Sequence, residues 1–174
     1  MDKIFVLLGL AITGVLLAVG VVAWQGYKFA TGQVHDQLAA QNIYFPPAGS
    51  ASFSAEEYPT LQQYAGQRVD NAAKAKAYAD DFIGHHLTKI ADGKTYAEVS
   101  TLAMANPTDT KLQGQKQTLF QGEMLRGMLL TAGYGYGTMG MLAKYAALIF
   151  FGGAMLMLIL VVLGWMHLQD VKRK

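Results

Sequence analysis

The chain has 174 residues, of which 52% are hydrophobic and 15% are charged, and its formal net charge is +2. Soluble domains usually carry about a quarter charged residues, so the composition argues against an ordinary soluble domain. The absence of cysteine excludes disulfides and cysteine-bound metal centres, and residues 25–143, with nine Lys/Arg against ten Asp/Glu, lack the basic surplus that nucleic-acid binding requires.

The first predicted element is a transmembrane helix over residues 4–24, after a short N-terminal segment, residues 1–3. Ile4–Trp24 is an uncharged, proline-free apolar run, about as long as the ~20 residues that cross a bilayer core. The alternative is a signal peptide, but the run is longer than the usual apolar region of one and has no clear cleavage site. Gly14 and Ala18, four residues apart, predict a face where another helix packs closely.

Residues 25–143 are predicted to form one helical domain. Gln25–Leu38 continues the first helix. Residues 42–50 contain two adjacent prolines, which forbid a helix and favour an extended stretch. Tyr44 and Phe45 precede these prolines and are expected to pack onto the domain, as a structural clasp or as part of a groove for a ligand or partner.

A long helix is predicted from about Leu61 to Ile90, after a capping-box spacing at Ser54 and Glu57. Apolar residues and one histidine recur at steps of three or four and form a stripe: Ala65, Val69, Ala72, Ala79, Phe82, His86 and Ile90. Because much of the stripe is alanine, its partner helix must come close.

Two adjacent histidines near the end of this helix, His85 and His86, are candidates for a polar site. His85 and His86 point about 100° apart on a helix, so they do not form a metal-binding pair. We expect His86 to be packed on the stripe and Asp81 to orient His85. A pH-sensing, metal or catalytic site at these three residues is the alternative, but no catalytic residue, metal or cofactor is predicted.

Two further helices follow. Gly93 ends the long helix, and Thr95 with Glu98 forms a capping box for a helix that runs to about Ala105. After a turn at residues 106–109, a helix is predicted over residues 111–131. Its apolar contacts are expected to be Leu112, Leu119, Phe120, Met124, Met128 and Leu130.

Arg126 is the lone charge in the apolar end of this helix. It therefore needs a partner, and Glu123, three residues earlier, is the nearest in sequence. A structural ion pair is one interpretation of Arg126, and a partner-binding residue is the other.

Residues 131–135, Thr-Ala-Gly-Tyr-Gly, resemble the selectivity filter of potassium channels. Thr131, Gly133, Tyr134 and Gly135 carry the resemblance, while Ala132 and Tyr136 depart from the filter pattern. About 100 residues separate the segment from the first span, far more than in small channels. We therefore predict a glycine-rich hinge at the membrane surface, and an oligomeric pore is the alternative.

The second transmembrane helix is predicted over residues 144–167, around the apolar run Tyr145–Met166. The tail, residues 168–174, ends in Lys172, Arg173 and Lys174, which places it in the cytoplasm by the positive-inside rule. Two spans then place both termini on the cytoplasmic side of a plasma membrane and residues 25–143 outside it.

Several segments together resemble the uncharacterised actinobacterial two-span membrane proteins that have an extracytoplasmic helical domain. The segments are Tyr44–Pro47, Tyr64–Gln67, Lys76–Ala79, His86–Leu87, Gly93–Ser100 and Leu125–Leu130. The resemblance implies a cell-envelope protein and no particular activity.

The sequence thus predicts an all-α protein in which two transmembrane helices flank an extracytoplasmic helical bundle. Without catalytic motifs, it is expected to be non-enzymatic and to bind or scaffold partners. These partners are the lipid bilayer and either itself, as a homo-oligomer, or another membrane protein, as an accessory subunit.

Overall fold

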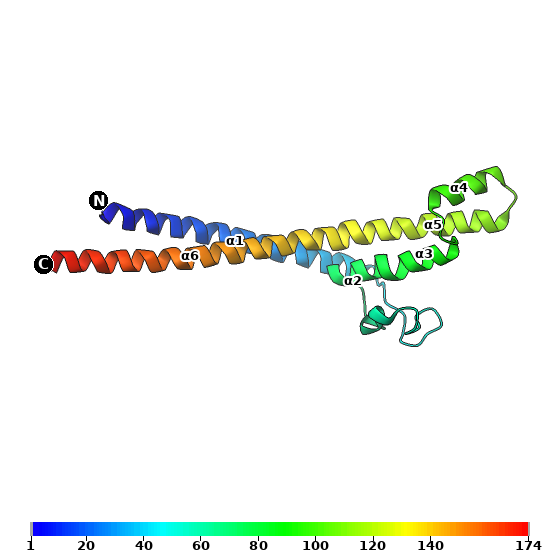
Figure 1. Cartoon of the computed structure of the whole chain (residues 1–174), viewed down its shortest axis with the longest axis horizontal. Coiled ribbons are helices and arrows are strands. Elements are labelled where there is room, and N and C mark those ends of the chain that lie inside the picture. The colour runs from blue at the N-terminus through cyan, green and yellow to red at the C-terminus, as the bar shows by residue number, and fades with distance from the viewer. Residues whose placement is uncertain (1, 174) are drawn as a thin grey trace. The chain divides into compact units, whose positions relative to one another are not determined.

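The computed structural model describes the backbone of residues 2–173 and the side chains of residues 3–171. This part of the chain is helical apart from its loops and an isolated β-bridge between Tyr44 and Arg68, which confirms the predicted all-α class. It divides into a terminal unit, residues 1–31 and 139–174, and a central unit, residues 32–138 (Figure 1). The side chains of the tail cations at 172–174 lie outside the described residues.

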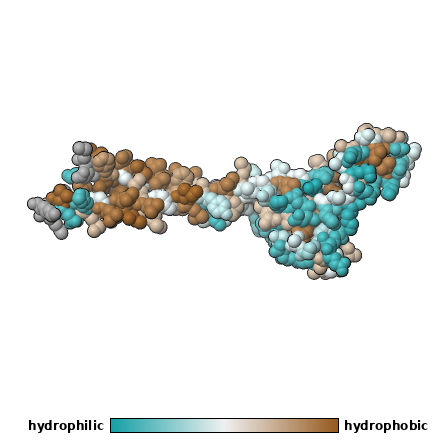
Figure 2. Space-filling view, viewed as in Figure 1, coloured by the Kyte–Doolittle hydropathy of each residue, from teal (hydrophilic) through white to brown (hydrophobic). Residues whose placement is uncertain are grey.

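The terminal unit pairs the first part of α1 (Asp2–Ala40) with α6 (Tyr136–Arg173). Both helices are long and apolar enough to cross a membrane. Their outward side chains are apolar and exposed, as the brown surface in Figure 2 shows, and Ile4, Val22 and Ile149 each expose at least 68% of their area. The two predicted apolar spans are therefore helical, and the first helix continues past Leu38 as predicted.

The two helices of the terminal unit meet along a seam rich in small residues. On α1 the inward positions follow one another at steps of three or four residues: Val6, Gly9, Thr13, Leu16 and Gly20. On α6 they include Gly140, Ala147, Ala154, Val161 and Gly164. This spacing is typical of helices that pack side by side at a small crossing angle. Because Gly20 has no side chain, the ring of Phe151 reaches the backbone of α1 there; a Cβ at Gly20 would lie 2.7 Å from this ring.

The face predicted for close packing is not on this seam. Gly14 and Ala18 are exposed, and no atom lies within 4 Å of the position that a Cβ on Gly14 would take. The helix carries small residues on more than one face, and the seam uses Gly9 and Gly20 instead. The spacing of Gly14 and Ala18 was therefore a poor guide to the packing between these two helices.

The central unit is built on one helical rod, which runs through α2 (Ala72–Ala77), the π-helix η2 (Tyr78–Gly84) and α3 (His85–Ile90). The side chain of Asn71 begins the rod by accepting the Lys74 backbone N–H at 3.0 Å. The rod ends where Asp92 and Gly93 take left-handed backbone conformations, so the predicted stop at Gly93 is confirmed.

The predicted start of this helix near Leu61 is wrong. Residues 59–64 form only a short 3₁₀ helix, η1 (Pro59–Tyr64), after which Gly66 adopts φ +68° and reverses the chain. The next residues run beside the 43–45 segment, where Val69 donates its backbone N–H to the Ile43 carbonyl at 2.8 Å. This pairing requires extended backbone, which overrides the helical spacing of the apolar residues.

Two more helices complete the central unit, α4 (Tyr96–Ala105) and α5 (Thr110–Met128). Thr95 and Glu98 form the predicted capping box, and α4 ends at Ala105 as expected. Asp109 caps α5 by accepting the Leu112 N–H at 3.0 Å. The capping box and the end of α4 follow from local signals in the sequence, and the structure confirms both.

The core of the central unit is aromatic on one side of the rod. The 43–58 loop folds over η2 and buries Phe45, Phe53 and Tyr58, of which Phe45 and Phe53 are no more than 1% exposed. The ring centroids of Phe53 and Phe82 lie 5.6 Å apart, and those of Phe45 and Tyr78 lie 5.0 Å apart, both edge to face. The prediction that Phe45 packs onto the domain is confirmed, whereas Tyr44 is half exposed.

On its other side, the rod packs small residues against glycines. The buried stripe consists of Ala75, Ala79, Ile83, Leu87 and Ala91. Facing it, a Cβ at Gly133 would lie 2.7 Å from Ala75, and a Cβ at Gly122 would lie 2.5 Å from Leu87. The close approach expected from the alanine content is confirmed, but the stripe itself is not the predicted one. Of the residues predicted for it, only Ala79 belongs to the buried stripe of the rod.

After α5 the chain remains helical through the π-helix η3 (Leu129–Gly135) into α6. Residues 131–135, predicted as a hinge, are therefore helical in the structure. Glycine lowers helix propensity by about 1 kcal/mol relative to alanine, but here Gly133 and Gly137 lie against Ala75 and Ala72 of α2. Close packing against α2 compensates for the weak helix propensity.

Candidate functional site

A polar cleft of ≈ 480 Å³ lies on the central unit, where the 57–61 segment meets the rod and α5. Its lining residues are Glu57, Tyr58, Thr60, Leu61, Asp80, Asp81, Gly84, His85, Thr88 and Arg126. Three segments far apart in the sequence therefore contribute to one surface, and most of the lining is polar. Two networks of charged side chains organise it.

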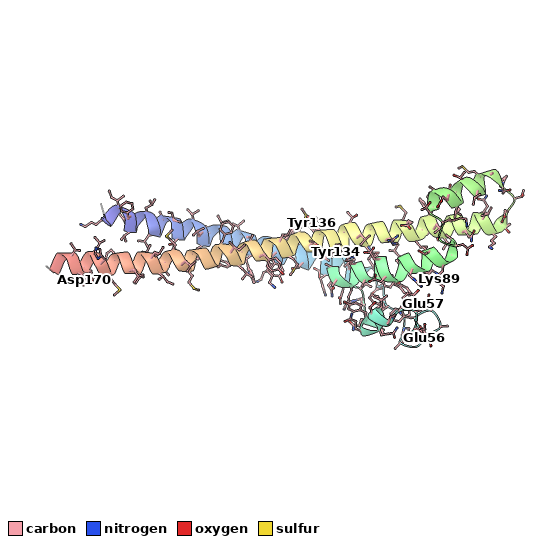
Figure 3. The ribbon with its side chains drawn as sticks, in the orientation of Figure 1. Glu56, Glu57, Lys89, Tyr134, Tyr136 and Asp170 are labelled. Carbon is pink, nitrogen blue, oxygen red and sulfur yellow. The ribbon has the colours of Figure 1, made fainter. Side chains whose placement is uncertain are left out.

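The first network is centred on Glu57, which Figure 3 labels together with Lys89. Its Oε1 accepts from the Lys89 Nζ at 2.8 Å and lies 2.9 Å from the His85 Nε2. The Lys89 hydrogen bond lowers the pKa of Glu57, and the His85 contact acts in the same direction against partial burial. The His85 ring also meets Tyr58 edge on, with centroids 5.2 Å apart, and burial raises the pKa of Tyr58.

This geometry corrects two expectations about the histidines. Asp81, predicted to orient His85, lines the cleft, but Glu57 is the carboxylate bonded to His85 in the described structure. His86, predicted to pack on the apolar stripe, is exposed, because the stripe passes through Leu87 one residue later. A helix register that differs by one residue rotates each side chain by about 100°.

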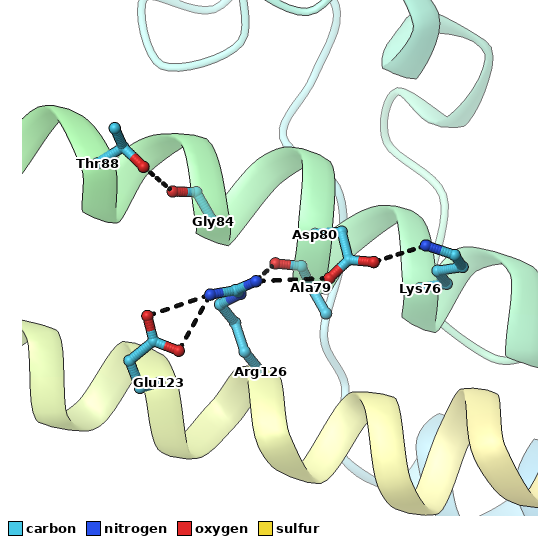
Figure 4. Close-up of polar contacts among 7 residues, drawn as sticks. All are labelled: Lys76, Ala79, Asp80, Gly84, Thr88, Glu123 and Arg126. Atoms are coloured by element: carbon cyan, nitrogen blue, oxygen red, sulfur yellow. Dashed lines mark hydrogen bonds and ion pairs between the residues drawn. The ribbon is translucent and has the colours of Figure 1, made fainter. Parts of the chain in front are cut away.

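The second network is centred on Arg126 and joins α5 to η2 (Figure 4). The Arg126 Nε donates to the Ala79 carbonyl at 3.0 Å, and Nη1 donates to both oxygens of Glu123 at 3.0 and 3.1 Å. Nη2 lies 3.5 Å from an Asp80 oxygen. Lys76 and, more weakly, Arg126 lower the pKa of Asp80. The expected pair of Arg126 with Glu123 is formed, and a contact with Asp80 is added.

Gly84 makes this arrangement possible. A Cβ at Gly84 would lie 3.4 Å from the Arg126 guanidinium, so the flat group rests against the rod where no side chain intervenes. The contact falls within the π-helical turn, whose wider backbone spacing tilts carbonyl groups away from the ordinary helical pattern. No pattern in the sequence indicates this π-helix, so the contact between Arg126 and the Ala79 carbonyl was not predicted.

The described contacts of the cleft connect the 57–61 segment and α5 to the rod. Glu57, Asp80 and Arg126 of the cleft lining each bond another charged side chain, and each arginine N–H assigned above already has an acceptor. Within residues 2–173, no group of three or more His, Asp or Glu side chains is arranged to hold a metal ion. Asp81, His85 and Lys89 remain exposed at the edge of the cleft.

A second candidate surface is apolar and lies on α5. Phe120, Met124 and Met128, predicted as contacts inside the bundle, expose 52%, 54% and 56% of their areas. They are four residues apart and therefore share one helix face. Gly127 lies beside them, and no atom is found within 4 Å of its Cβ position. We call Phe120, Met124, Gly127 and Met128 the α5 stripe. The sequence identified its apolar residues but assigned them to the wrong face.

The filter-like segment does not have a filter geometry. Thr131–Gly135 is π-helical, so its carbonyl groups lie along a helix rather than in the extended row that the resemblance implies. Gly133 packs on α2, and the Tyr134 ring lies 5.5 Å below the Lys76 Nζ. These residues therefore serve helix packing in the central unit, and no contact found here favours a pore.

No protein-family model, curated protein or solved structure matches this chain, so the assignment of function rests on the residues and contacts described above.

Proposed function

We propose that this chain is a non-enzymatic integral membrane protein that binds another membrane protein subunit through its central unit. Its two apolar helices cross the plasma membrane, both termini lie in the cytoplasm, and the central unit lies outside. The subunit that it binds is a second copy of the chain or a different protein.

The membrane assignment is supported by the ends of the terminal unit. Trp24 and Tyr27 lie together at one end, with ring centroids 5.3 Å apart, and the Lys144 Nζ lies 5.5 Å from the Tyr27 ring centroid. Trp165 lies near the other end. Tryptophan, tyrosine and lysine prefer the interface between hydrocarbon and water, and these positions bracket the apolar length of both helices.

The observation that carries the partner-binding proposal is the α5 stripe. A helix face with three large apolar side chains, each more than half exposed, is unfavourable in water. Methionine side chains adapt to varied apolar surfaces, and the bare backbone at Gly127 lets another helix approach closely. We infer that an apolar helix of the partner packs along this stripe.

In this proposal the charged cleft has a structural role. Its carboxylates and cations neutralise one another, and its arginine bridges two helices, so it keeps α5 fixed on the rod. A rigid helix presents a stripe of side chains in a constant geometry, which favours binding by lowering its entropic cost.

Site-specific photo-crosslinking in native membranes tests this function. A photo-crosslinking amino acid replaces Met124 in one variant and Gln63, an exposed residue of η1, in a control variant. We expect discrete adducts from position 124 and none from position 63. An adduct at twice the chain mass identifies a second copy, and another mass identifies a different subunit. Equal yields at the two positions would contradict the proposed role of the stripe.

A further inference from the structure

The terminal unit has an apolar groove at the end that carries both termini. Figure 1 shows α1 and α6 diverging towards the N and C labels. Near this end a Cβ on Gly164 would lie 3.3 Å from the Val6 side chain, so the two helices are still close there. Beyond it a groove of ≈ 310 Å³ opens, lined by Lys3, Val6, Leu7, Trp165, Leu168 and Gln169.

The groove combines apolar walls with a polar rim. Val6, Leu7, Leu168 and the body of Trp165 form the walls, while the Lys3 ammonium, the Gln169 amide and the indole N–H are the polar groups. A lysine near the chain terminus reaches the membrane surface by extending its ammonium group away from its apolar stem. The groove therefore has a mainly apolar lining that includes three side chains with N–H donors.

A second groove on the same two helices lacks this combination. It measures ≈ 300 Å³ and is lined by apolar residues together with His167, and it contains no lysine. The positive charge is thus specific to the first groove. Inside a bilayer both grooves face acyl chains, but of the two only the first has a lysine in its lining.

We propose that the first groove binds one anionic phospholipid of the cytoplasmic leaflet, with an acyl chain between Leu7 and Leu168 and the phosphate at Lys3. This inference rests on the proposed membrane insertion and orientation. An acyl chain packs against the apolar lining of the groove, and attraction of an anionic headgroup by a basic residue at the surface selects an anionic lipid. The lipid closes the gap between the helices at their diverging ends.

Tryptophan quenching tests this site in the full chain. The chain has two tryptophans, so the Trp24→Phe variant leaves Trp165 as the sole reporter. The variant is reconstituted into vesicles of brominated phosphatidylcholine or brominated phosphatidylglycerol, mixed with the unlabelled lipid. The extent of quenching gives the relative affinity of the groove for the two headgroups.

We expect Trp165 to favour phosphatidylglycerol by about fivefold, the effect of one lysine near an anionic surface. Lys3→Gln in the same background should reduce the ratio to about one. Neutralising the tail with Lys172→Gln, Arg173→Gln and Lys174→Gln should leave most of the preference in place. A preference that survives Lys3→Gln but disappears with the tail cations would overturn the site.

The outcomes also separate this site from the membrane assignment. Absence of quenching by either brominated lipid would mean that the terminal unit is not in the bilayer, and both proposals would fail. Strong quenching with no headgroup preference would agree with the membrane assignment and would refute only the lipid site.

Discussion

Replacing Arg126 by alanine should destabilise the central unit by about 2 kcal/mol. The hydrogen bond to the Ala79 carbonyl is charge-assisted, and such bonds contribute about 1.5–3 kcal/mol. The ion pairs with Glu123 and Asp80 are partly solvated, since the arginine side chain is 26% exposed, and each adds at most about 0.5 kcal/mol. In the Arg126→Ala variant, water in the open cleft can donate a hydrogen bond to the Ala79 carbonyl. The total destabilisation should therefore lie near the lower end of the range that these contributions give.

The assay is thermal unfolding of the full chain in detergent, followed by the near-ultraviolet circular dichroism of the buried aromatic cluster. For a unit of this size, about 2 kcal/mol corresponds to a decrease of about 8 °C in Tm. Arg126→Lys should recover roughly half of this loss, because an ammonium group keeps the charge but cannot reproduce the planar fork.

Glu123→Gln is the matched control. It removes a half-exposed charge but leaves the bond between Arg126 and the rod, so its Tm should fall by less than about 2 °C. Equal decreases for Arg126→Ala and Glu123→Gln would refute the argument. That result would mean that the contact between α5 and η2 contributes nothing beyond a surface ion pair.

Three further outcomes can be measured on the full chain. Two neighbouring cations hold the pKa of Asp80 below its ordinary value of 3.8. The ionised carboxylate should therefore stabilise the fold above about pH 4, and this stabilisation should be lost as the pH falls through the lowered pKa. When Tm is measured from pH 7 to pH 3, it should fall less for Asp80→Asn than for the unchanged chain. Gly127→Ala should raise Tm by about 3 °C because its Cβ meets open space, whereas Gly133→Ala should lower it because its Cβ meets Ala75 at 2.7 Å. Since the chain lacks cysteine, a cysteine at Gln63 should react with an impermeant maleimide added to intact cells, and one after the last residue should not; the reverse labelling would contradict the orientation.

Signals confined to a few neighbouring residues were sufficient for a large part of the fold. The capping box at Thr95 and Glu98 supplies two hydrogen bonds within one turn, so its effect does not depend on tertiary structure. The pair of Arg126 and Glu123 likewise depends on a spacing of three residues along one helix. The apolar runs of the spans are helical for a similar reason, since their length and composition act locally.

The errors arose where distant segments decide the local structure. The residues from Leu61 to Asn71 carry a helical apolar spacing, but the chain uses them for a 3₁₀ turn and for pairing with the 43–45 segment. The sequence around residues 61–71 contains no information about their pairing with the distant 43–45 segment. The partner of His85 was missed for the same reason, because Glu57 lies 28 residues away in sequence.

The α5 stripe shows a different limit of sequence periodicity. The spacing of Phe120, Met124 and Met128 correctly places them on one face of a helix, but it does not say what covers that face. Within the central unit the opposite face of α5, through Leu119 and Gly122, packs on the rod, because the bare backbone at Gly122 admits Leu87. A larger residue at 122 would keep the helices apart, so the position of one glycine decides which face is buried. On the bulkier apolar face, Phe120 meets the Tyr96 ring of α4 with centroids 5.9 Å apart, but each large side chain stays more than half exposed. The proposed partner helix would cover this exposed area.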